Sequence, residues 1–282
     1  MSRVLFLSSL IIILIAGCAV FTSNKFADVE PAADIELAPV FGNHQVLQQK
    51  MEIPVWGTAE PGGRITVKLD DQEKTALVQP DGTWRIDLEP MTAGGPYELA
   101  IIGENTIRLS NVMIGEVYVC SGQSNMEWSL SKAVNAQQEI ENADYPEIRL
   151  FTVQRNLSKV PIDSIITRGW QVCSPKTAPE FSAVGYFFGR YLHKELNIPV
   201  GLIHTSWGGT PAEAWTSTGA LKKLPDFAAM IEELEKNAGT EEELVRQYEE
   251  AVAEWEVQIE KWKESLEQID PGFHGDGKKW FD

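Results

Sequence analysis

Between residues 35 and 113 the hydrophobic positions come in short runs separated by polar and turn residues. In the run RITVKLD, which starts at Arg64, apolar and polar residues alternate, as in a strand with one buried face. Turn residues separate the runs, for example Pro80 to Gly82 before TWRIDL. No helical pattern interrupts this region. The pattern therefore predicts a small β-sandwich over residues 35–113.

From residue 114 onward the pattern changes. The run NVMIGEVYVC, ending at Cys120, is continuously apolar, as in a strand that is buried on both faces of a parallel sheet. Ser182 is the expected N-cap of a following helix, and IPVGLIHTSWGG predicts a second buried strand before a helix in TPAEAWTSTGAL. The apolar face of the first helix is expected to contain Val184, Phe187, Phe188, Tyr191, Leu192 and Leu196. Strand, helix and strand with short connections predict an α/β domain over residues 114–282.

The acidic segment from Gly239 to Ile269 predicts one long helix. Thr240 and Glu243 form a capping box, and apolar residues follow in steps of four and three. We expect this stripe to pack on its own domain, with a partner-binding coiled coil as the alternative.

Composition and charge narrow the choice of function. With 282 residues, 43% hydrophobic and 23% charged, the chain is typical of a globular protein with two units. The formal net charge of −17 repels phosphate backbones, which disfavours nucleic acid and favours a neutral, polyhydroxylated ligand. Much of the acidity lies in the last quarter, where a solvated helix face also explains it.

The N-terminus resembles an export signal. Residues 1–18 place an arginine before an apolar run, and LIAGC resembles a lipobox with Cys18 as the lipidated residue. Residues 19–34 then form a polar tether. An uncleaved N-terminal anchor is the alternative. Both interpretations predict a protein that works outside the cytoplasm and contacts the membrane through its N-terminus, in the first case through a lipid anchor.

Two further cysteines remain, Cys120 and Cys173. A disulfide is permitted in an exported protein, but a buried free thiol at a strand end suits Cys120 equally well. Neither their number nor their spacing predicts a metal site.

Two polar loops follow the predicted strands, SGQSNM after Cys120 and SWGGTP after His204. Open α/β sheets bind ligands at the carboxyl ends of their strands. A serine on such a turn can attack a carbonyl, while Gly208 and Gly209 could supply N–H groups to an oxyanion. Met126 and Trp128 are expected to anchor the helix that follows. Serine and glycine are also ordinary loop residues, and the G-x-S-x-G elbow of common α/β hydrolases is absent.

The segments GEVYVCSGQSNMEW, RGWQVCSP and FSAVGYFFGRYLHKELNIPVGLIHTSWGGTPAEAWTS resemble the sialate O-acetylesterase family, a branch of the SGNH (GDSL-like) serine esterases, and the sandwich segment resembles that family's N-terminal domain. The resemblance implies a flavodoxin-like three-layer α/β/α domain that removes acetyl groups from sugar hydroxyls without a cofactor. Ser124, rather than Ser121, matches the nucleophile. Gly208 and Gly209 match the oxyanion loop, and Gln123, Asn125 and Trp207 are expected to bind the O-acetylated sugar, although Trp207 could instead be a core residue.

The sequence also departs from that family. Its later Gln-Gly-Glu block and C-terminal Asp-x-x-His element are not found, so we expect a truncated member whose base lies outside this chain. Four histidines are present. His44 is expected on the sandwich surface, His193 on a solvated helix face and His274 in a loop. His204 is the nearest candidate base, or a strand histidine bonded locally.

Two carboxylates are further candidates for the site, and two other functions remain as alternatives. Glu127 and Glu213 could contact a sugar hydroxyl, but acidic residues near helix N-termini are also favoured electrostatically. The main alternative function is a non-catalytic glycan-binding or surface-assembly protein with a degenerate esterase pocket. An acetylxylan-type esterase would share the chemistry.

Overall fold

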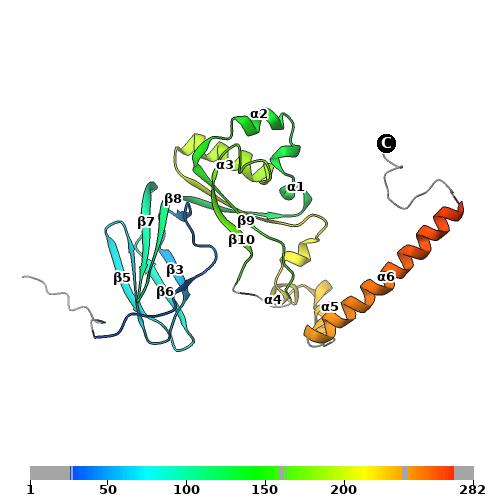
Figure 1. The fold of residues 1–282 in the computed structure, drawn as a ribbon, viewed down its shortest axis with the longest axis horizontal. Coiled ribbons are helices and arrows are strands. Elements are labelled where there is room, and N and C mark those ends of the chain that lie inside the picture. The colour runs from blue at the N-terminus through cyan, green and yellow to red at the C-terminus, as the bar shows by residue number, and fades with distance from the viewer. Residues whose placement is uncertain (1–25, 27, 159–161, 163, 237–240, 270–282) are drawn as a thin grey trace, which may run out of the picture. The chain divides into compact units, whose positions relative to one another are not determined.

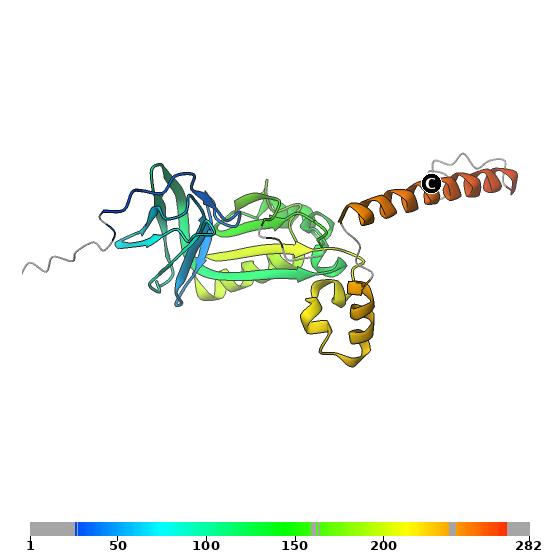
Figure 2. The same ribbon diagram turned by 90° about the horizontal axis from the view of Figure 1, so that it is seen from below.

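The computed structural model describes residues 26, 28–158, 162, 164–236 and 241–269, and contacts within the chain divide it into two units, residues 1–210 and 211–282 (Figures 1 and 2). The predicted signal with Cys18, the cap residue Thr240 and the loop with His274 lie outside the described residues. The strands are β1 (Glu36–Leu37), β2 (Val46–Gln48), β3 (Ile53–Thr58), β4 (Arg64–Leu69), β5 (Gln72–Leu77), β6 (Thr83–Leu88), β7 (Gly94–Ile102), β8 (Thr106–Gly122), β9 (Tyr145–Val153), β10 (Thr167–Cys173) and β11 (Val200–Ser206). The helices are α1 (Ser124–Glu127), η1 (Leu130–Lys132), α2 (Ala136–Glu141), α3 (Ala183–Leu196), η2 (Ala212–Trp215), α4 (Thr218–Leu221), α5 (Pro225–Lys236) and α6 (Glu241–Ile269).

The N-terminal part is a β-sandwich, as the alternating pattern predicts. One sheet has the strand order β1-β3-β6, and the other is formed by β5, β4, β7 and the first half of β8. Ile65, Val67 and Leu69 of β4 are fully buried between the sheets, and the small sheet contributes Val55 and Ile86 to the same core. Alternation in the sequence therefore identified the inward face of these strands.

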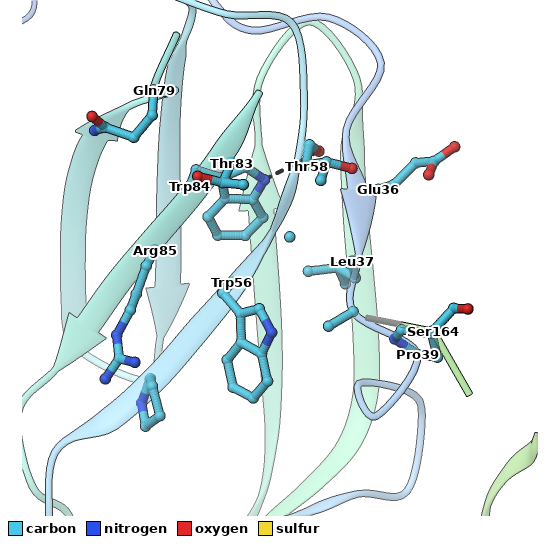
Figure 3. Close-up of a pocket in the computed structure, with 13 residues that line it drawn as sticks. Glu36, Leu37, Pro39, Trp56, Thr58, Gln79, Thr83, Trp84, Arg85 and Ser164 are labelled. Atoms are coloured by element: carbon cyan, nitrogen blue, oxygen red, sulfur yellow. Dashed lines mark hydrogen bonds between the residues drawn. The ribbon is translucent and has the colours of Figure 1, made fainter. Parts of the chain in front are cut away.

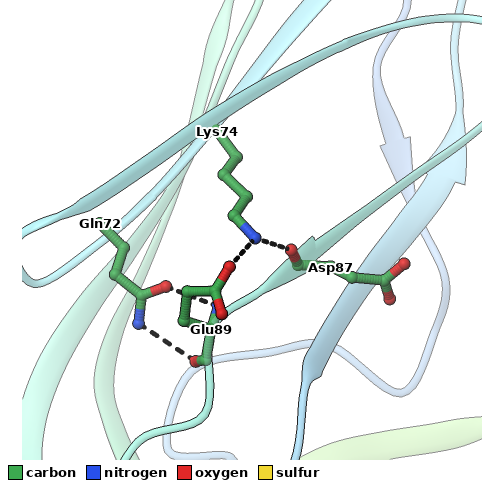
Figure 4. Close-up of polar contacts among 4 residues, drawn as sticks. All are labelled: Gln72, Lys74, Asp87 and Glu89. Carbon is green, nitrogen blue, oxygen red and sulfur yellow. Dashed lines mark hydrogen bonds and ion pairs between the residues drawn. The ribbon is translucent and has the colours of Figure 1, made fainter.

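The two sheets of the sandwich are joined along one edge by polar contacts between β5 and the end of β6 (Figure 4). The Lys74 ammonium donates to the carbonyl of Asp87 at 2.7 Å and pairs with the Glu89 carboxylate at 2.6 Å. The Gln72 side chain accepts from the Glu89 N–H at 2.7 Å and donates to its carbonyl at 3.2 Å. Because these bonds satisfy backbone groups at a sheet edge, they close the edge against further strand pairing.

Strand β8 connects the sandwich to the α/β part. The eight-stranded sheet has the order β10-β9-β11-β8-β7-β4-β5, with β2 also paired to β8, so the predicted boundary between residues 113 and 114 lies inside β8. The buried guanidinium of Arg149 on β9 donates to the carbonyl of His44 at 3.2 Å and to the side-chain oxygen of Asn111 at 3.1 Å. The two parts of unit 1 are thus joined by β8 itself, by its pairing with β2 and by the buried Arg149, and the Trp170 ring N–H adds a bond to the Val40 carbonyl at 2.7 Å.

Helix α3 begins at its expected N-cap, because the Ser182 hydroxyl accepts from the Gly185 N–H at 3.1 Å. The expected apolar face is wrong at four of its six residues. Val184, Phe188, Tyr191 and Leu196 are exposed, whereas Phe187 and Leu192 are partly buried against the core. The buried residues of the helix are Tyr186 and three small ones, Ala183, Gly185 and Gly189. A Cβ on Gly185 would lie 3.2 Å from Cys120 Sγ, and one on Gly189 would lie 2.6 Å from Leu202 Cδ1. The two glycines let the helix backbone approach β8 and β11 closely.

The other face of this sheet is only partly covered by described residues. Trp170 and Val46 pack over Gly201 of β11, but Val119 of β8 is 64% exposed. The expectation that residues 111–120 are buried on both faces is therefore wrong at the carboxyl end of the strand. Helices α1, α3 and η1 contact one another, and Figure 1 shows α2 and α3 on one side of the sheet. The fold is mixed α/β with an N-terminal sandwich, as predicted.

Unit 2 consists of helices. The segment after residue 211 forms two short helices, η2 and α4, where the sequence predicted one, and α5 follows. The predicted long helix is present as α6, but Tyr248, Trp255 and Trp262 on its apolar stripe are exposed. The expectation that α6 buries this stripe on its own domain is thus not met among the described residues. No helix in the described part of the chain is long and apolar enough to cross a membrane.

Candidate functional site

Two polar loops lie side by side because their strands are neighbours. Strand β11 pairs with β8 in parallel, and Ser206 is in register with Gly122, the last residue of β8. The chain then continues into the second loop, where the Trp207 N–H donates to the Gly122 carbonyl at 3.0 Å. A Cβ on Gly208 would lie 3.7 Å from Ser124 Cα. The fold thus brings the glycine loop against the serine turn at the carboxyl edge of the sheet.

Ser124 is the first residue of α1 and is exposed. Gly122 turns the chain with a φ of +141°, a value that glycine adopts most readily. Gln123 and Asn125, on either side of Ser124, are also exposed and open to a ligand.

Met126 and Trp128, the two residues expected to anchor the helix that follows the loop, differ in their burial. Met126 is half-buried, and its sulfur lies 3.3 Å from the Ser182 hydroxyl at the start of α3. Trp128 is 54% exposed, so its ring does not anchor the segment by burial. Its indole N–H instead donates to the Lys132 carbonyl at 3.0 Å, which ties the turn to the segment that follows.

The Glu127 carboxylate bridges the two loops. One of its oxygens accepts from the Gly208 N–H, and the other pairs with the Arg155 guanidinium. Arg155 also lies over the Trp207 ring, 5.5 Å from its centroid. The Gly208 N–H expected to stabilise an oxyanion is thus occupied by Glu127 in this conformation. Sequence reasoning missed Arg155, because it lies in an irregular segment after β9 with no motif around it.

His204 is near this cluster but does not contact Ser124. Its Nε2 lies 2.6 Å from the Ser206 hydroxyl, its ring packs edge-on against Phe181 at 5.4 Å, and its buried Nδ1 has no partner among the described residues. Burial lowers the pKa of His204, the Glu127 carboxylate raises it and Arg155 lowers it. The imidazole is therefore neutral at neutral pH, as a base must be. Among the described residues, however, no histidine or carboxylate is hydrogen-bonded to the Ser124 hydroxyl.

The other described histidines, His44 and His193, are bonded to groups away from the Ser124 loop. His44 Nδ1 lies 2.8 Å from the Asn111 side-chain nitrogen, and burial and Arg149 lower the pKa of this histidine. His193, expected to be solvated, is half-buried with Nδ1 2.8 Å from the Ile198 carbonyl. Glu213, the second candidate carboxylate, belongs to unit 2.

A polar hollow of about 410 Å³ lies beside His204. Phe181, which contacts the His204 ring, lines it together with Thr152, which is in register with His204 on β9. Arg168 and Glu180 add exposed charges of opposite sign, and Gln154, Gly169, Gln171 and Thr177 complete the lining. Its volume and hydrogen-bonding groups suit a ligand the size of a sugar ring.

The cysteines take no part in this cluster. Cys120 and Cys173 are both free and buried. Burial raises the pKa of Cys120, and burial together with Asp144 raises that of Cys173 to about 12. Both are thus protonated thiols at neutral pH. Within the described part of the chain, no group of three or more His, Cys, Asp or Glu residues is arranged to hold a metal ion.

An exposed serine on a tight turn at the carboxyl edge of an α/β sheet, next to a glycine loop, is typical of a serine hydrolase site. The family model described as "Carbohydrate esterase, sialic acid-specific acetylesterase" matches residues 114–271, more than half of the 282-residue chain. The chain belongs to this family.

Individual proteins similar to this chain support the same family. The chain is 35% identical over 208 residues to the sialate O-acetylesterase of Mus musculus (66% of this chain, 38% of that protein), and 32% identical over 219 residues to that of Homo sapiens (70% and 42%). The crystal structure of a carbohydrate acetylesterase from Xanthomonas citri matches with a TM-score of 0.66 and 32% identity, covering 67% of this chain and 44% of that one. The chain thus spans about two fifths of the length of the curated relatives it matches.

Proposed function

We propose that this chain carries the nucleophile of a carbohydrate O-acetylesterase, with Ser124 attacking the acetyl group of an O-acetylated sugar. The observation that carries the proposal is the contact between the two loops. Because β8 and β11 pair in parallel, the Gly208 loop lies against the serine turn, and a Cβ added to Gly208 would lie 3.7 Å from Ser124 Cα. Membership of the acetylesterase family supports the same chemistry.

The reaction proceeds through an acyl-serine. The Ser124 hydroxyl oxygen attacks the acetyl carbonyl carbon, while its proton passes to a general base. The tetrahedral intermediate collapses by breaking the bond to the sugar oxygen, which takes the proton from the base. Water then attacks acetyl-Ser124 with the help of the same base, and acetate leaves. No redox partner or organic cofactor enters these steps.

The oxyanion of the tetrahedral intermediate needs backbone donors. The Ser124 N–H and the Gly208 to Gly209 loop are the groups proposed for this role. Because Glu127 accepts from the Gly208 N–H, its carboxylate must turn away before that donor can serve an oxyanion. Arg155 already holds the other carboxylate oxygen and could keep Glu127 in the withdrawn position. The base is proposed to be a histidine outside the described residues, because His204 is bonded to Ser206 and neither His44 nor His193 is bonded to Ser124.

Two features of the Ser124 site favour one alternative function. A Ser124 hydroxyl without a hydrogen-bonded base among the described residues, and a Gly208 N–H occupied by Glu127, also suit a non-catalytic glycan-binding or surface-assembly protein. Exposed Gln123, Asn125 and Ser124 would then hydrogen-bond a sugar without hydrolysing it.

Acetate release from O-acetylated sugars tests the proposal. The substrates are O-acetylated sialic acid and acetylated xylan, and each is supplied to the 282-residue chain and to a form extended by any residues that its gene encodes beyond Asp282. Ser124→Ala should reduce release to the uncatalysed level, whereas Ser121→Ala, at an exposed serine of the same loop, should retain it. Equal activity of wild type and Ser124→Ala would show that the nucleophile is wrong. Folded but inactive wild type in both forms would favour the non-catalytic alternative.

The proposed location depends on the first eighteen residues alone. We propose export and lipid attachment at Cys18, which would hold the protein at the membrane in the periplasm or at the cell surface. Labelling with a radioactive fatty acid should mark the wild type and not Cys18→Ala. Equal labelling of both would disprove lipidation at this residue.

A further inference from the structure

The outer face of the three-stranded sheet carries an open groove of about 900 Å³ that the proposed function does not use (Figure 3). Residues of β3 and β6 alternate across this sheet. Val55 and Ile86 point into the core, so Trp56 and Arg85, which are in register, lie on the outer face. Thr58 and Thr83 form the next outward pair on the same two strands. The groove thus combines an aromatic ring with a row of hydrogen-bonding side chains.

Trp56 is held in place although it is not buried. Trp56 is 39% exposed. The Phe41 ring packs edge-on against its indole, with the ring centroids 4.7 Å apart and an interplanar angle of 76°. Figure 3 shows the Trp56 indole extending between Arg85 and the β1 segment with Leu37. The neighbouring Trp84, by contrast, is 2% exposed, and its ring N–H donates to the Thr58 carbonyl at 3.2 Å. Trp84 stabilises the sandwich, whereas Trp56 offers a fixed apolar surface to a ligand.

The charges around the groove favour a neutral ligand. Arg85, the cation among the lining residues, already pairs with Asp87 at 2.8 Å. Glu36, on the opposite side, is an exposed carboxylate. An anion would therefore meet a neutralised cation and a negative charge, while the hydroxyl groups of a neutral sugar can bond to both. Gln79, Thr58 and Thr83 add further donors and acceptors along the lining.

A second hollow, of about 210 Å³, continues from the groove past Trp56. It shares Pro54 and Trp56 with the groove and is otherwise lined mainly by apolar residues, among them Phe41 and Trp170. The indole thus lies where two hollows meet. A ligand that follows both would extend beyond a single ring, which fits a segment of a polymer better than a monosaccharide.

We propose that this face of the sandwich binds a neutral polysaccharide, with one pyranose ring stacked on Trp56 and adjacent hydroxyls bonded to Arg85, Glu36 and the two threonines. The apolar face of a pyranose ring packs on indole, as it does in sugar-binding sites generally. This site is separate from the Ser124 loop and does not depend on hydrolysis. It would hold the protein on the polymer whether or not the polymer is acetylated.

Native affinity electrophoresis of the whole chain tests the site, with deacetylated xylan, deacetylated glucomannan or mixed-linkage β-glucan cast in the gel. These probes carry no acetyl ester, so the Ser124 chemistry is not engaged. The wild type should be retarded by at least one of them. Trp56→Ala should weaken binding about tenfold, the scale of one aromatic contact, and Trp56→Phe should retain part of it. Thermal unfolding is followed alongside to establish that each variant is folded.

Matched variants show whether retardation in the gel depends on the groove around Trp56. Trp255→Ala removes an exposed tryptophan of α6 and should bind as the wild type does, as should Ser124→Ala. Arg85→Ala should weaken binding without unfolding the sandwich, because its side chain is exposed. The proposal is overturned if no probe retards the wild type, if folded Trp56→Ala and Arg85→Ala both bind normally, or if Ser124→Ala abolishes retardation.

Discussion

The close packing of α3 on the sheet makes a quantitative prediction for Gly189→Ala. In an exposed helix this change stabilises by up to about 1 kcal/mol, because alanine is the better helix former. Here the new methyl would lie 2.6 Å from Leu202 Cδ1, 3.1 Å from Cδ2 and 3.2 Å from Cγ. Leu202 is fully buried and cannot turn away, so overpacking should cost about 1 to 3 kcal/mol. With an overpacking cost near the middle of that range, about 2 kcal/mol, and a helix-propensity gain of about 1 kcal/mol, we expect a net loss of about 1 kcal/mol in the free energy of unfolding.

Urea unfolding followed by circular dichroism measures this loss, with the transition of unit 1 fitted separately. Gly219→Ala in α4 is the control for helix propensity without a clash, because no heavy atom lies within 4 Å of the added Cβ. Gly219 belongs to unit 2, so this change should leave the transition of unit 1 unaltered and be neutral or slightly stabilising in that of unit 2. In a Leu202→Ala background the clash is removed, and Gly189→Ala should no longer destabilise. A Gly189→Ala protein as stable as the wild type would refute close helix–sheet contact as the reason for glycine at this position.

Two further predictions concern buried polar groups. Arg149→Met leaves the carbonyls of His44 and Pro146 and the Asn111 side chain without their donor, so the free energy of unfolding should fall by about 2 to 4 kcal/mol. Arg155→Met, at a half-exposed arginine, should cost less, and equal effects of the two changes in urea unfolding would contradict the buried network. The pKa of His204 is lowered on folding, so its contribution to stability is present above pH 6.5 and is lost as the pH falls below that value. His204→Gln should therefore flatten the fall in stability as the pH drops below about 6.5, and an unchanged slope would show that His204 is not buried in the neutral form.

Local patterns predicted most of the fold. Alternation identified the buried face of β4, Ser182 identified the start of α3, and the turn at Asp81 is stabilised by a bond from the Thr83 N–H to its carboxylate at 3.0 Å. The packed face of α3 was predicted only in part, because hydrophobic periodicity gives weight to large side chains, while Ala183, Gly185 and Gly189 make much of this interface beside Tyr186. Close approach of backbones depends on what faces each glycine, which a single sequence does not reveal.

The candidate site was predictable only in part. The loop after β8 and the loop after β11 could be identified from their residues and their place at strand ends, and the neighbouring position of the two strands follows from the fold. The Glu127 bridge to Gly208 and Arg155 could not be predicted, because it joins three segments far apart in the sequence. A local bond was one of the two alternatives that the sequence left open for His204, and the structure shows it, with Ser206, two residues along the same strand, as the partner.

The central claim, that Ser124 is the nucleophile, is tested most directly by trapping the acyl-enzyme. The chain, extended by any residues that its gene encodes beyond Asp282, is mixed with 4-nitrophenyl acetate, quenched in acid within the first turnover and digested. The peptides that contain residues 117–132 are then sequenced by mass spectrometry. The account predicts an acetyl group on Ser124 in the wild type and in Ser121→Ala, and none in this peptide of Ser124→Ala. Acetylation of Ser121, or an acetyl-free loop in protein that releases 4-nitrophenol, would contradict it.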